Sequence, residues 1–323
     1  MSTIRKMRGK WQSIIRIQGH PVISKTFVSK SDASRWALLT EGKLRREDAG
    51  ISRIKFPKFE DVARRYIEEI SVLKKCYYDE RSKILEIIDK TILSGNYIGG
   101  KQVNLFEKKI ANICKTKYCV SLNSGTDALT LALFSLGVKK GDEVITPANS
   151  FIASTAVIVH LGAKPVFVDV KKDQNIDEDK IIKKITKKTK VIMPVHLTGR
   201  MCNMVKIKEI SKKFKIPIVE DCAQSILSKY NNYFSGSYGE IGCFSAHPLK
   251  NLNAIGDGGY LTTNSKIIYE KILALRNHGI VKRNVVKKFG YVSRMDNLQA
   301  AILNYKLKNL KNIIDIRRQN AKV

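Results

Sequence analysis

The feature that most constrains the fold is a regular alternation of short apolar runs and amphipathic segments, which begins near Tyr77. Strand-like runs occur at Tyr118–Leu122, Glu143–Thr146, Pro165–Val168, Val191–Val195 and Pro217–Glu220. Segments with helical spacing lie between them, at Asp127–Ser135, Ala153–His160, Asp177–Ile185 and Met204–Phe214. Strands that alternate with helices in this way predict an α/β domain with a mostly parallel sheet covered by helices.

Length and composition fit a chain with a sizeable core. Its 323 residues allow two or three domains, and 43% hydrophobic with 27% charged residues excludes a disordered or fibrous chain. The longest apolar stretches, such as Thr155–Ala163, are far shorter than the roughly 20 residues of a membrane span. The first thirty residues contain charges throughout and no apolar central block, so we expect no secretory signal, and the six cysteines form no C-x-x-C pair. We therefore expect a cytoplasmic protein without disulfides, a metal site or a membrane contact.

The net charge of +30 is distributed unevenly along the chain. Residues 1–75 hold 18 Lys and Arg against 8 Asp and Glu, with nine Arg and nine Lys, whereas the remainder holds 34 Lys and only seven Arg. Lysine pairs such as Lys212-Lys213 lie on amphipathic segments, where a solvated lysine-rich face explains them. The change in the ratio of Arg to Lys indicates two pieces of different origin.

The first piece has the pattern of a small sheet followed by a helix. Alternating residues in Trp11–Ile17 and Val22–Val28 flank a turn at 18–21, which predicts a hairpin. Ser31 and Asp32 then offer a cap for a helix that we expect to end near Gly42. This predicts a ββ(β)α module, then a charged linker up to residue 58 and a further helix from Phe59.

The segment GKWQSIIRIQGHPVISKTFVSKSDASRWA resembles the amino-terminal arm-type DNA-binding domain of phage-type tyrosine recombinases. The helix from Phe59 is similar to the start of their core-binding domain, and their catalytic domain has no counterpart in this chain. The resemblance implies an arm-type module over residues 1–58, a helix and junction over 59–81, and duplex DNA as a partner for residues 1–75.

In the second piece, polar and small residues follow three of the apolar runs. Ligands of α/β proteins collect at the carboxyl ends of the strands. Gly125 and Thr126 open a helix whose amides and dipole favour a phosphate, and Asp221 ends an apolar run. Taken alone, the turn at Gly125 and Thr126 is more commonly only a helix cap, and a helix cap explains Asp221 equally well. Lys250 follows another apolar run and precedes the glycine-rich turn Gly256–Gly259.

Together, a phosphate cradle, a strand-end carboxylate and a lone lysine define a pyridoxal phosphate site. The lysine forms a Schiff base, the carboxylate keeps the pyridine nitrogen protonated and the helix end holds the phosphate. The sequence resembles the DegT/DnrJ/EryC1/StrS family of sugar aminotransferases over residues 82–323. The motifs that carry the resemblance are SLNSGTDALTLAL, GDEVITPANSFIASTAVIVHLGAKPVFVDV, VEDCAQS, GCFSAHPLKNLNAIGDGGYLTTN, LRNHG and SRMDNLQAAIL.

The resemblance implies a PLP-dependent transferase of fold type I and a role for each matching residue. Lys250 and Asp221 would be catalytic, as the Schiff-base lysine and the partner of the pyridine nitrogen. Phe151 would stack on the cofactor ring, although a core aromatic has the same appearance. Gly125, Thr126 and Ser245 would bind the phosphate, and Gln224 would contact the ring's 3-oxygen.

The implied reaction transfers an amino group from an amino acid, glutamate or glutamine, to a nucleotide-linked keto sugar in amino-sugar or cell-surface polysaccharide biosynthesis. A homodimer is also implied, with Tyr97 and Ile98 on the contacting face. Two departures stand against this. Val292 replaces an Asn expected near the partner's phosphate, and the chain stops within an expected helix Asp296–Val323, so it looks carboxyl-truncated. The alternative is a catalytically silent fusion or a DNA-binding remnant of a phage-type integrase.

Overall fold

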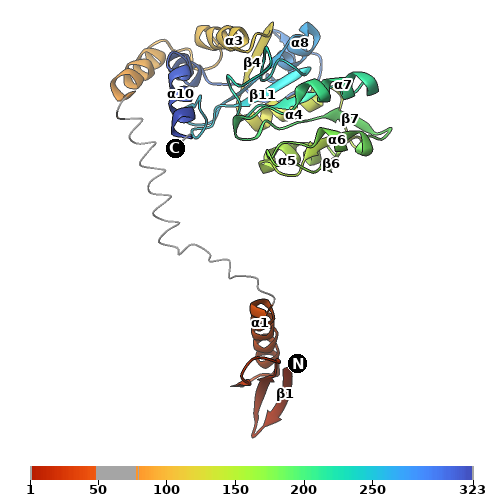
Figure 1. Ribbon diagram of the computed structural model, residues 1–323. Helices are drawn as coiled ribbons and strands as arrows, with labels where there is room; N and C mark the ends of the chain where they lie inside the picture. The colour runs from red at the N-terminus through yellow and green to blue at the C-terminus, as the bar shows by residue number, and fades with distance from the viewer. Residues whose placement is uncertain (1, 49–77, 79, 322–323) are drawn as a thin grey trace. The chain divides into compact units, whose positions relative to one another are not determined.

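The computed structural model describes residues 2–48, 78 and 80–321 (Figure 1). Contacts divide the chain into two compact units, Met1–Asp79 and Glu80–Val323, which we describe separately. The expected linker after residue 48, the helix from Phe59 and Cys76 lie outside the described residues.

The first unit is a three-stranded antiparallel sheet with one helix. The strands are β1 (Ser2–Met7), β2 (Lys10–Ile15) and β3 (Ile23–Phe27), in the order β1-β2-β3, and the helix is α1 (Lys30–Asp48). The hairpin and the helix are confirmed, but the predicted cap is wrong: Ser31 and Asp32 lie inside the helix, and the Ser29 hydroxyl caps it by accepting a 3.1 Å hydrogen bond from Asp32 N. The helix continues beyond Gly42, where we predicted its end, because a glycine inside a helix costs only about 1 kcal/mol relative to alanine.

Helix α1 covers one face of this sheet. Ile15, Ala33 and Ala37 are buried there, and the rings of Phe27 and Trp36 lie 5.7 Å apart. Phe27 lies on the face that α1 covers. Successive side chains of a strand point to opposite faces of the sheet, so the residue before Phe27 and the residues paired with it across the sheet point to the open face. Arg5, Gln12 and Thr26 form a cross-strand row on that open face, with a 3.1 Å hydrogen bond from Arg5 Nε to Gln12 Oε1.

The second unit is built on a sheet of seven strands, one of them antiparallel. Their order is β4 (Tyr118–Leu122), β12 (Gly259–Thr263), β11 (Ile241–Ser245), β8 (Val219–Asp221), β7 (Thr189–Ile192), β5 (Glu143–Pro147) and β6 (Lys164–Val168). Parallel bridges from Ile192 to Ile218 and from Val195 to Asp221 join its two halves. Only β12 runs antiparallel to its neighbours, so the predicted mostly parallel α/β sheet is confirmed.

Helices pack on both faces of this sheet (Figure 1). One core lies under α4 (Gly125–Ser135), α5 (Ile152–His160) and α8 (Lys266–Leu275). The opposite face is covered by α3 (Lys101–Cys114), α6 (Glu178–Ile181), α7 (Met204–Phe214), α9 (Asn297–Lys306) and α10 (Leu310–Asn320). Alternate residues of a strand pack in different cores: Val120 and Leu122 lie in the first, and Cys119 lies in the second.

Two of the predicted helices differ in detail. The helix expected over Asp296–Val323 is two helices, because the chain leaves helical geometry at Asn309, which caps α10. The helix expected over Asp177–Ile185 is a single α-turn followed by a 3-10 turn over Ile182–Lys184, and Ile185 is already extended towards β7. The unit also contains a helix over residues 80–93 and two short ribbons: β9 (Lys229–Tyr230) with β10 (Tyr233–Phe234), and β13 (Ile280–Lys282) with β14 (Val285–Val286). None of the helices in the described ranges combines the length and the apolar character that a membrane crossing needs.

Candidate active site

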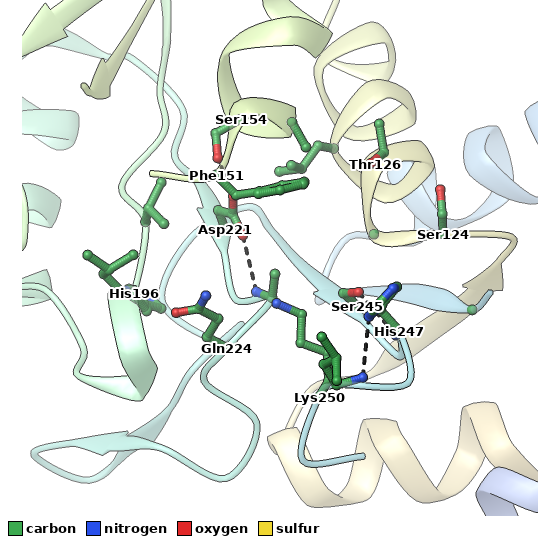
Figure 2. Close-up of a pocket in the computed structure, with 18 of the residues that line it drawn as sticks. Ser124, Thr126, Phe151, Ser154, His196, Asp221, Gln224, Ser245, His247 and Lys250 are labelled. Atoms are coloured by element: carbon green, nitrogen blue, oxygen red, sulfur yellow. Dashed lines mark hydrogen bonds between the residues drawn. The ribbon is translucent and has the colours of Figure 1, made fainter. Parts of the chain in front are cut away.

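A cavity of about 290 Å³ opens at the carboxyl ends of β4, β8 and β11. The structure brings all seven predicted site residues into its lining, although they come from four separate segments of the chain. They are Gly125, Thr126, Phe151, Asp221, Gln224, Ser245 and Lys250. Figure 2 shows Phe151, Asp221 and Lys250 extending into the same space. Parallel strands explain the convergence, because their carboxyl ends meet at one edge of the sheet.

The amino-terminal turn of α4 forms one wall. The Ser124 hydroxyl caps the helix by accepting a 3.0 Å hydrogen bond from Asp127 N, so the amides of Gly125 and Thr126 lie before the first intrahelical bond. A Cβ on Gly125 would lie 2.7 Å from the Cβ of Ser245, and one on Gly259 would collide with the Ser124 carbonyl carbon. Glycine at both positions lets this turn sit directly against the strands.

Asp221 ends β8 at the base of the cavity and is only 5% exposed. Its Oδ2 accepts a 2.8 Å hydrogen bond from the Ser154 hydroxyl, and Oδ1 accepts one of 3.1 Å from Ala223 N. Burial raises the pKa of the Asp221 carboxyl, and these two hydrogen bonds oppose the rise. No helix follows Asp221: residues 223–224 form a turn, so the bond to Ala223 stabilises a turn and not the helix that the alternative interpretation expected.

Lys250 lies in the turn after β11, where its amide donates a 2.8 Å hydrogen bond to His247 O. The turn is anchored to the strand by Ser245 Oγ, which accepts a 3.2 Å hydrogen bond from His247 N. Loss of water around the half-buried amine lowers the pKa of Lys250, and the nearby charge of Asp221 acts in the opposite direction. A neutral amine is therefore more accessible here than on a surface lysine.

Phe151 and Gln224 approach the cavity from its other sides. Phe151 precedes α5 and is 72% exposed, so it does not serve the protein core. The Gln224 amide oxygen accepts a 2.6 Å hydrogen bond from the amide of Thr198, a residue held at φ 54°. Because this bond occupies the oxygen, the Gln224 NH₂ group remains as a donor for an oxygen atom in the cavity.

Sequence reasoning missed Ser154, His196, His247 and Asp257, which also line the cavity. Ser154 lies in the first turn of the helix that follows Phe151, and this position next to a predicted site residue could have identified it from the sequence. His196 follows an apolar run, as Asp221 does, and strand-end position was the criterion that found Asp221.

His196, Glu220 and Cys222 are buried together, with potential ligand atoms within 4.8 Å of one another. Both Glu220 oxygens are already engaged: Oε1 accepts from Tyr238 N and Gly239 N, each at 2.8 Å, and Oε2 accepts from Gly236 N at 3.1 Å. His196 Nε2 lies 3.0 Å from the same Oε2. These contacts use the lone pairs that a metal would need, so the cluster is a hydrogen-bond network that holds β8 to the loop before β11.

Two expected features of a subunit contact lie outside the cavity lining. Tyr97 and Ile98 are 56% and 59% exposed, and Val292 is 60% exposed beside its bridge to Asn277. In the described part of the chain, these apolar side chains therefore face solvent.

Comparison with known proteins agrees with this geometry. The profile of the DegT/DnrJ/EryC1/StrS aminotransferase family matches residues 78–323. A dTDP-3-amino-3,6-dideoxy-α-D-galactopyranose transaminase of Aneurinibacillus thermoaerophilus is 44% identical over 244 residues, which cover 75% of this chain and 67% of that protein. A pleiotropic regulatory protein of Geobacillus stearothermophilus is 39% identical over 250 residues, with 77% and 67% covered.

Among solved structures, S. venezuelae DesV in complex with a ketimine intermediate superposes with a TM-score of 0.72 at 36% identity, over 74% of this chain and 65% of DesV. NtdA of Bacillus subtilis with bound PMP gives a TM-score of 0.68 at 36% identity, over 72% and 53%. The chain thus spans about two thirds of the length of these two curated relatives, and the family match includes the whole cavity. From residue 78 onward, the chain belongs to the DegT/DnrJ/EryC1/StrS aminotransferase family.

Proposed function

We propose that this protein binds pyridoxal phosphate in the described cavity and transfers an amino group from an amino acid to a nucleotide-linked keto sugar. The observation that carries the proposal is the convergence of a buried carboxylate, a partly desolvated lysine and a helix amino terminus on one cavity. The cofactor, when bound, supplies an electron sink for the carbon that loses a proton.

The cavity residues fit this cofactor in three respects. The amides of Gly125 and Thr126 are oriented to receive a phosphate at the positive end of α4. The largely exposed ring of Phe151 offers a flat apolar face to an aromatic ring. The Gln224 NH₂ group, fixed through Thr198, suits a ring oxygen. A buried Asp221 carboxylate needs a cationic or proton-donating partner, and a protonated pyridine nitrogen is such a group.

Lys250 has two tasks in this proposal. Its Nζ would hold the cofactor through a bond to the aldehyde carbon, formed with loss of water, until the amino group of the incoming amino acid displaces it. The freed Nζ, as a neutral amine, would then move a proton from the substrate carbon to a neighbouring carbon. The lowered pKa of Lys250 supports both tasks because each requires the unprotonated amine. Asp221 holds the proton on the ring nitrogen, and Phe151 keeps the ring in place.

The names of the relatives support a nucleotide-linked sugar as the acceptor. One is a dTDP-amino-sugar transaminase, and another is a UDP-N-acetyl-3-dehydro-α-D-glucosamine 3-aminotransferase that is 40% identical over 242 residues. A 3-oxo-glucose-6-phosphate:glutamate aminotransferase, 36% identical, supports glutamate as the donor. We assign the reaction to amino-sugar biosynthesis in the cytoplasm, where the five described cysteines, all buried, stay as thiols.

The direct test is reduction with borohydride after incubation with pyridoxal phosphate. We expect a visible absorbance band that reduction removes, and mass spectrometry is expected to find the pyridoxyl group on Lys250. Lys250→Ala should abolish both signals. Lys266→Ala is the matched control, because Lys266 lies on the exposed side of α8 and its variant should retain them.

An adduct on another lysine would contradict the assignment of Lys250. A normal adduct without amino transfer to any dTDP- or UDP-linked keto sugar would leave a cofactor-binding protein that is catalytically silent. That outcome is the alternative interpretation of the sequence.

A homodimer is the assembly we propose, with Tyr97 and Ile98 in the contact. Their exposure supports it, since a pair of large apolar side chains gains by leaving water. Light scattering is the test. A stable monomer that binds cofactor as tightly as any dimer would count against a site shared between subunits.

Residues 2–48 favour DNA binding as a second function. The first thirty residues contain seven Lys and Arg and no Asp or Glu. Arg5 and Lys10 belong to the sheet face that α1 leaves open, beside Gln12 and Thr26. On an open sheet, cationic side chains can contact DNA phosphates, and neighbouring polar side chains can contact base edges. The similarity to the recombinase arm domain remains a prediction that this arrangement supports.

The full chain should then bind duplex DNA with a salt slope of about −0.9 per neutralised phosphate. Arg5→Glu with Lys10→Glu should weaken the binding strongly. Lys187→Glu with Lys188→Glu removes the same charge from an exposed loop of the second unit and should have a small effect. Binding that is insensitive to salt, or lost equally in both variants, would argue against this function.

A further inference from the structure

The first turn of α5 carries two side chains that reach the cavity. Phe151 occupies the cap position, and Ser154 follows within the same turn, where its amide bonds to Phe151 O at 3.1 Å. Phe151 is largely exposed, whereas Ser154 is fully buried. Figure 2 shows Ser154, Phe151 and Asp221 close together at the cavity. One helical turn therefore contacts both the ring position and the carboxylate below it.

The Ser154 hydroxyl has an unusual use for a helical serine. Such hydroxyls commonly bond back to a carbonyl of the preceding turn, as Ser135 does to Ala132 O at 2.8 Å. Ser154 instead donates across the structure to Asp221 Oδ2, at 2.8 Å. Its partner is a carboxylate that is only 5% exposed, and a hydrogen bond to a buried ionised group is about twice as strong as one between neutral groups.

The two hydrogen bonds of Asp221 define the orientation of its carboxylate. Ala223 N approaches Oδ1 at 3.1 Å from the chain that follows β8, and Ser154 approaches Oδ2 from α5. Each oxygen keeps one further lone pair, so the carboxylate can still accept a proton donor from the cavity. Without Ser154, the group could turn about its Cβ–Cγ bond, and burial would favour its protonated form.

We propose that Ser154 is a positioning residue, whose hydroxyl fixes the Asp221 carboxylate towards the ring nitrogen while its own helical turn sets the stacking position of Phe151. This inference rests on the proposed binding of pyridoxal phosphate. Ser154 does not touch the substrate carbon, and it acts through Asp221. The first turn of α5 then acts on both the stacking and the charge pairing, so both shift if this turn moves.

The test compares Ser154→Ala, Ser154→Thr and the control Ser135→Ala, each loaded with cofactor labelled with ¹⁵N in the ring. Ser154→Ala should move the ¹⁵N signal towards that of neutral pyridine and weaken cofactor binding about tenfold, since a charge-assisted hydrogen bond is lost. It should lower kcat while leaving the KM for the sugar within about twofold. Ser154→Thr should restore the signal, and Ser135→Ala should leave it unchanged.

A double variant separates positioning from general packing. With Asp221→Asn already present, adding Ser154→Ala should change cofactor binding less than twofold, because the two residues act as one unit. An unchanged ¹⁵N signal in Ser154→Ala, or full additivity in the double variant, would overturn the inference while wild-type binding of the cofactor stands. A wild-type protein that binds no pyridoxal phosphate would instead overturn the proposed function and the inference with it.

Discussion

Glu220 and Asp221 are neighbours on β8, and their carboxylates serve opposite sides of the strand. Glu220 is fully buried and accepts three backbone amides of the loop before β11, while Asp221 lines the cavity. Alternation along a strand produces this division. Glu220 therefore fixes the end of the strand, and this gives Asp221 a defined position.

Glu220→Gln should destabilise the protein strongly. The amide would place an NH₂ group against backbone N–H donors in a fully buried site, and the cost should be roughly 3–5 kcal/mol. Chemical denaturation would measure the change in the free energy of unfolding. Glu270→Gln, at an exposed ion pair with Lys266, should change it by less than about 0.5 kcal/mol. Equal effects of both substitutions would contradict a structural role for Glu220.

Gly125→Ala should lower stability by about 1–3 kcal/mol, because the new methyl group would lie 2.7 Å from the Ser245 Cβ. Thermal unfolding without cofactor would detect it. Adding Ser245→Gly removes the opposing atom and should recover part of the loss. If the double variant is no more stable than Gly125→Ala alone, close packing of α4 on β11 is not the reason for glycine.

Phe151→Leu should weaken cofactor binding about two- to tenfold, the range that aromatic pairing adds beyond burial. The melting temperature without cofactor should change little, since the ring is 72% exposed. Fluorescence titration with pyridoxal phosphate is the measurement. Phe289→Leu alters a ring that is 97% exposed elsewhere and is expected to bind cofactor normally. Unchanged affinity in Phe151→Leu would remove this ring from the site.

Lys250→Met should stabilise the cofactor-free protein at neutral pH. Burial lowers the pKa of Lys250 in the folded state, so the proton binds the unfolded chain more tightly and favours unfolding. This penalty is fully present below the folded-state pKa and disappears as the pH rises past the ordinary lysine value of 10.5. The gain in melting temperature should therefore shrink towards that pH. For Lys266→Met, at an exposed position, no such trend is expected.

The sequence predicted the parts of the site that depend on strand ends and local motifs. Lys250 and Asp221 were found because each follows an apolar run, and both line the cavity, although their chemical roles remain predictions. Ser154 was not found, because its bond to Asp221 joins residues far apart in sequence. The orientation of Gln224 was equally hidden, since it depends on the backbone of Thr198 at a positive φ.

For the fold, periodicity was sufficient where helices and strands are long. The strand Tyr118–Leu122 and the helix Met204–Phe214 have the predicted bounds. The breaks at Asn309 and Ile182 were missed, because the helical pattern continues through them while capping and the next strand end the helix. Family membership confirms the expected fold type, the aminotransferase class and the family's dependence on pyridoxal phosphate.

The contact of Gly259 with Ser124 has a consequence for the order of folding. The turn that begins α4 follows β4 and the Lys250 turn follows β11, and β12 must insert between these two strands before the turns become neighbours. Pairings over such sequence separations form late, because the intervening chain must first be closed into a loop. During synthesis, a nascent chain whose β12 is still inside the ribosome would not yet have the two turns next to each other, and its cofactor cavity would be incomplete. Cofactor binding would therefore begin only when the sheet is complete.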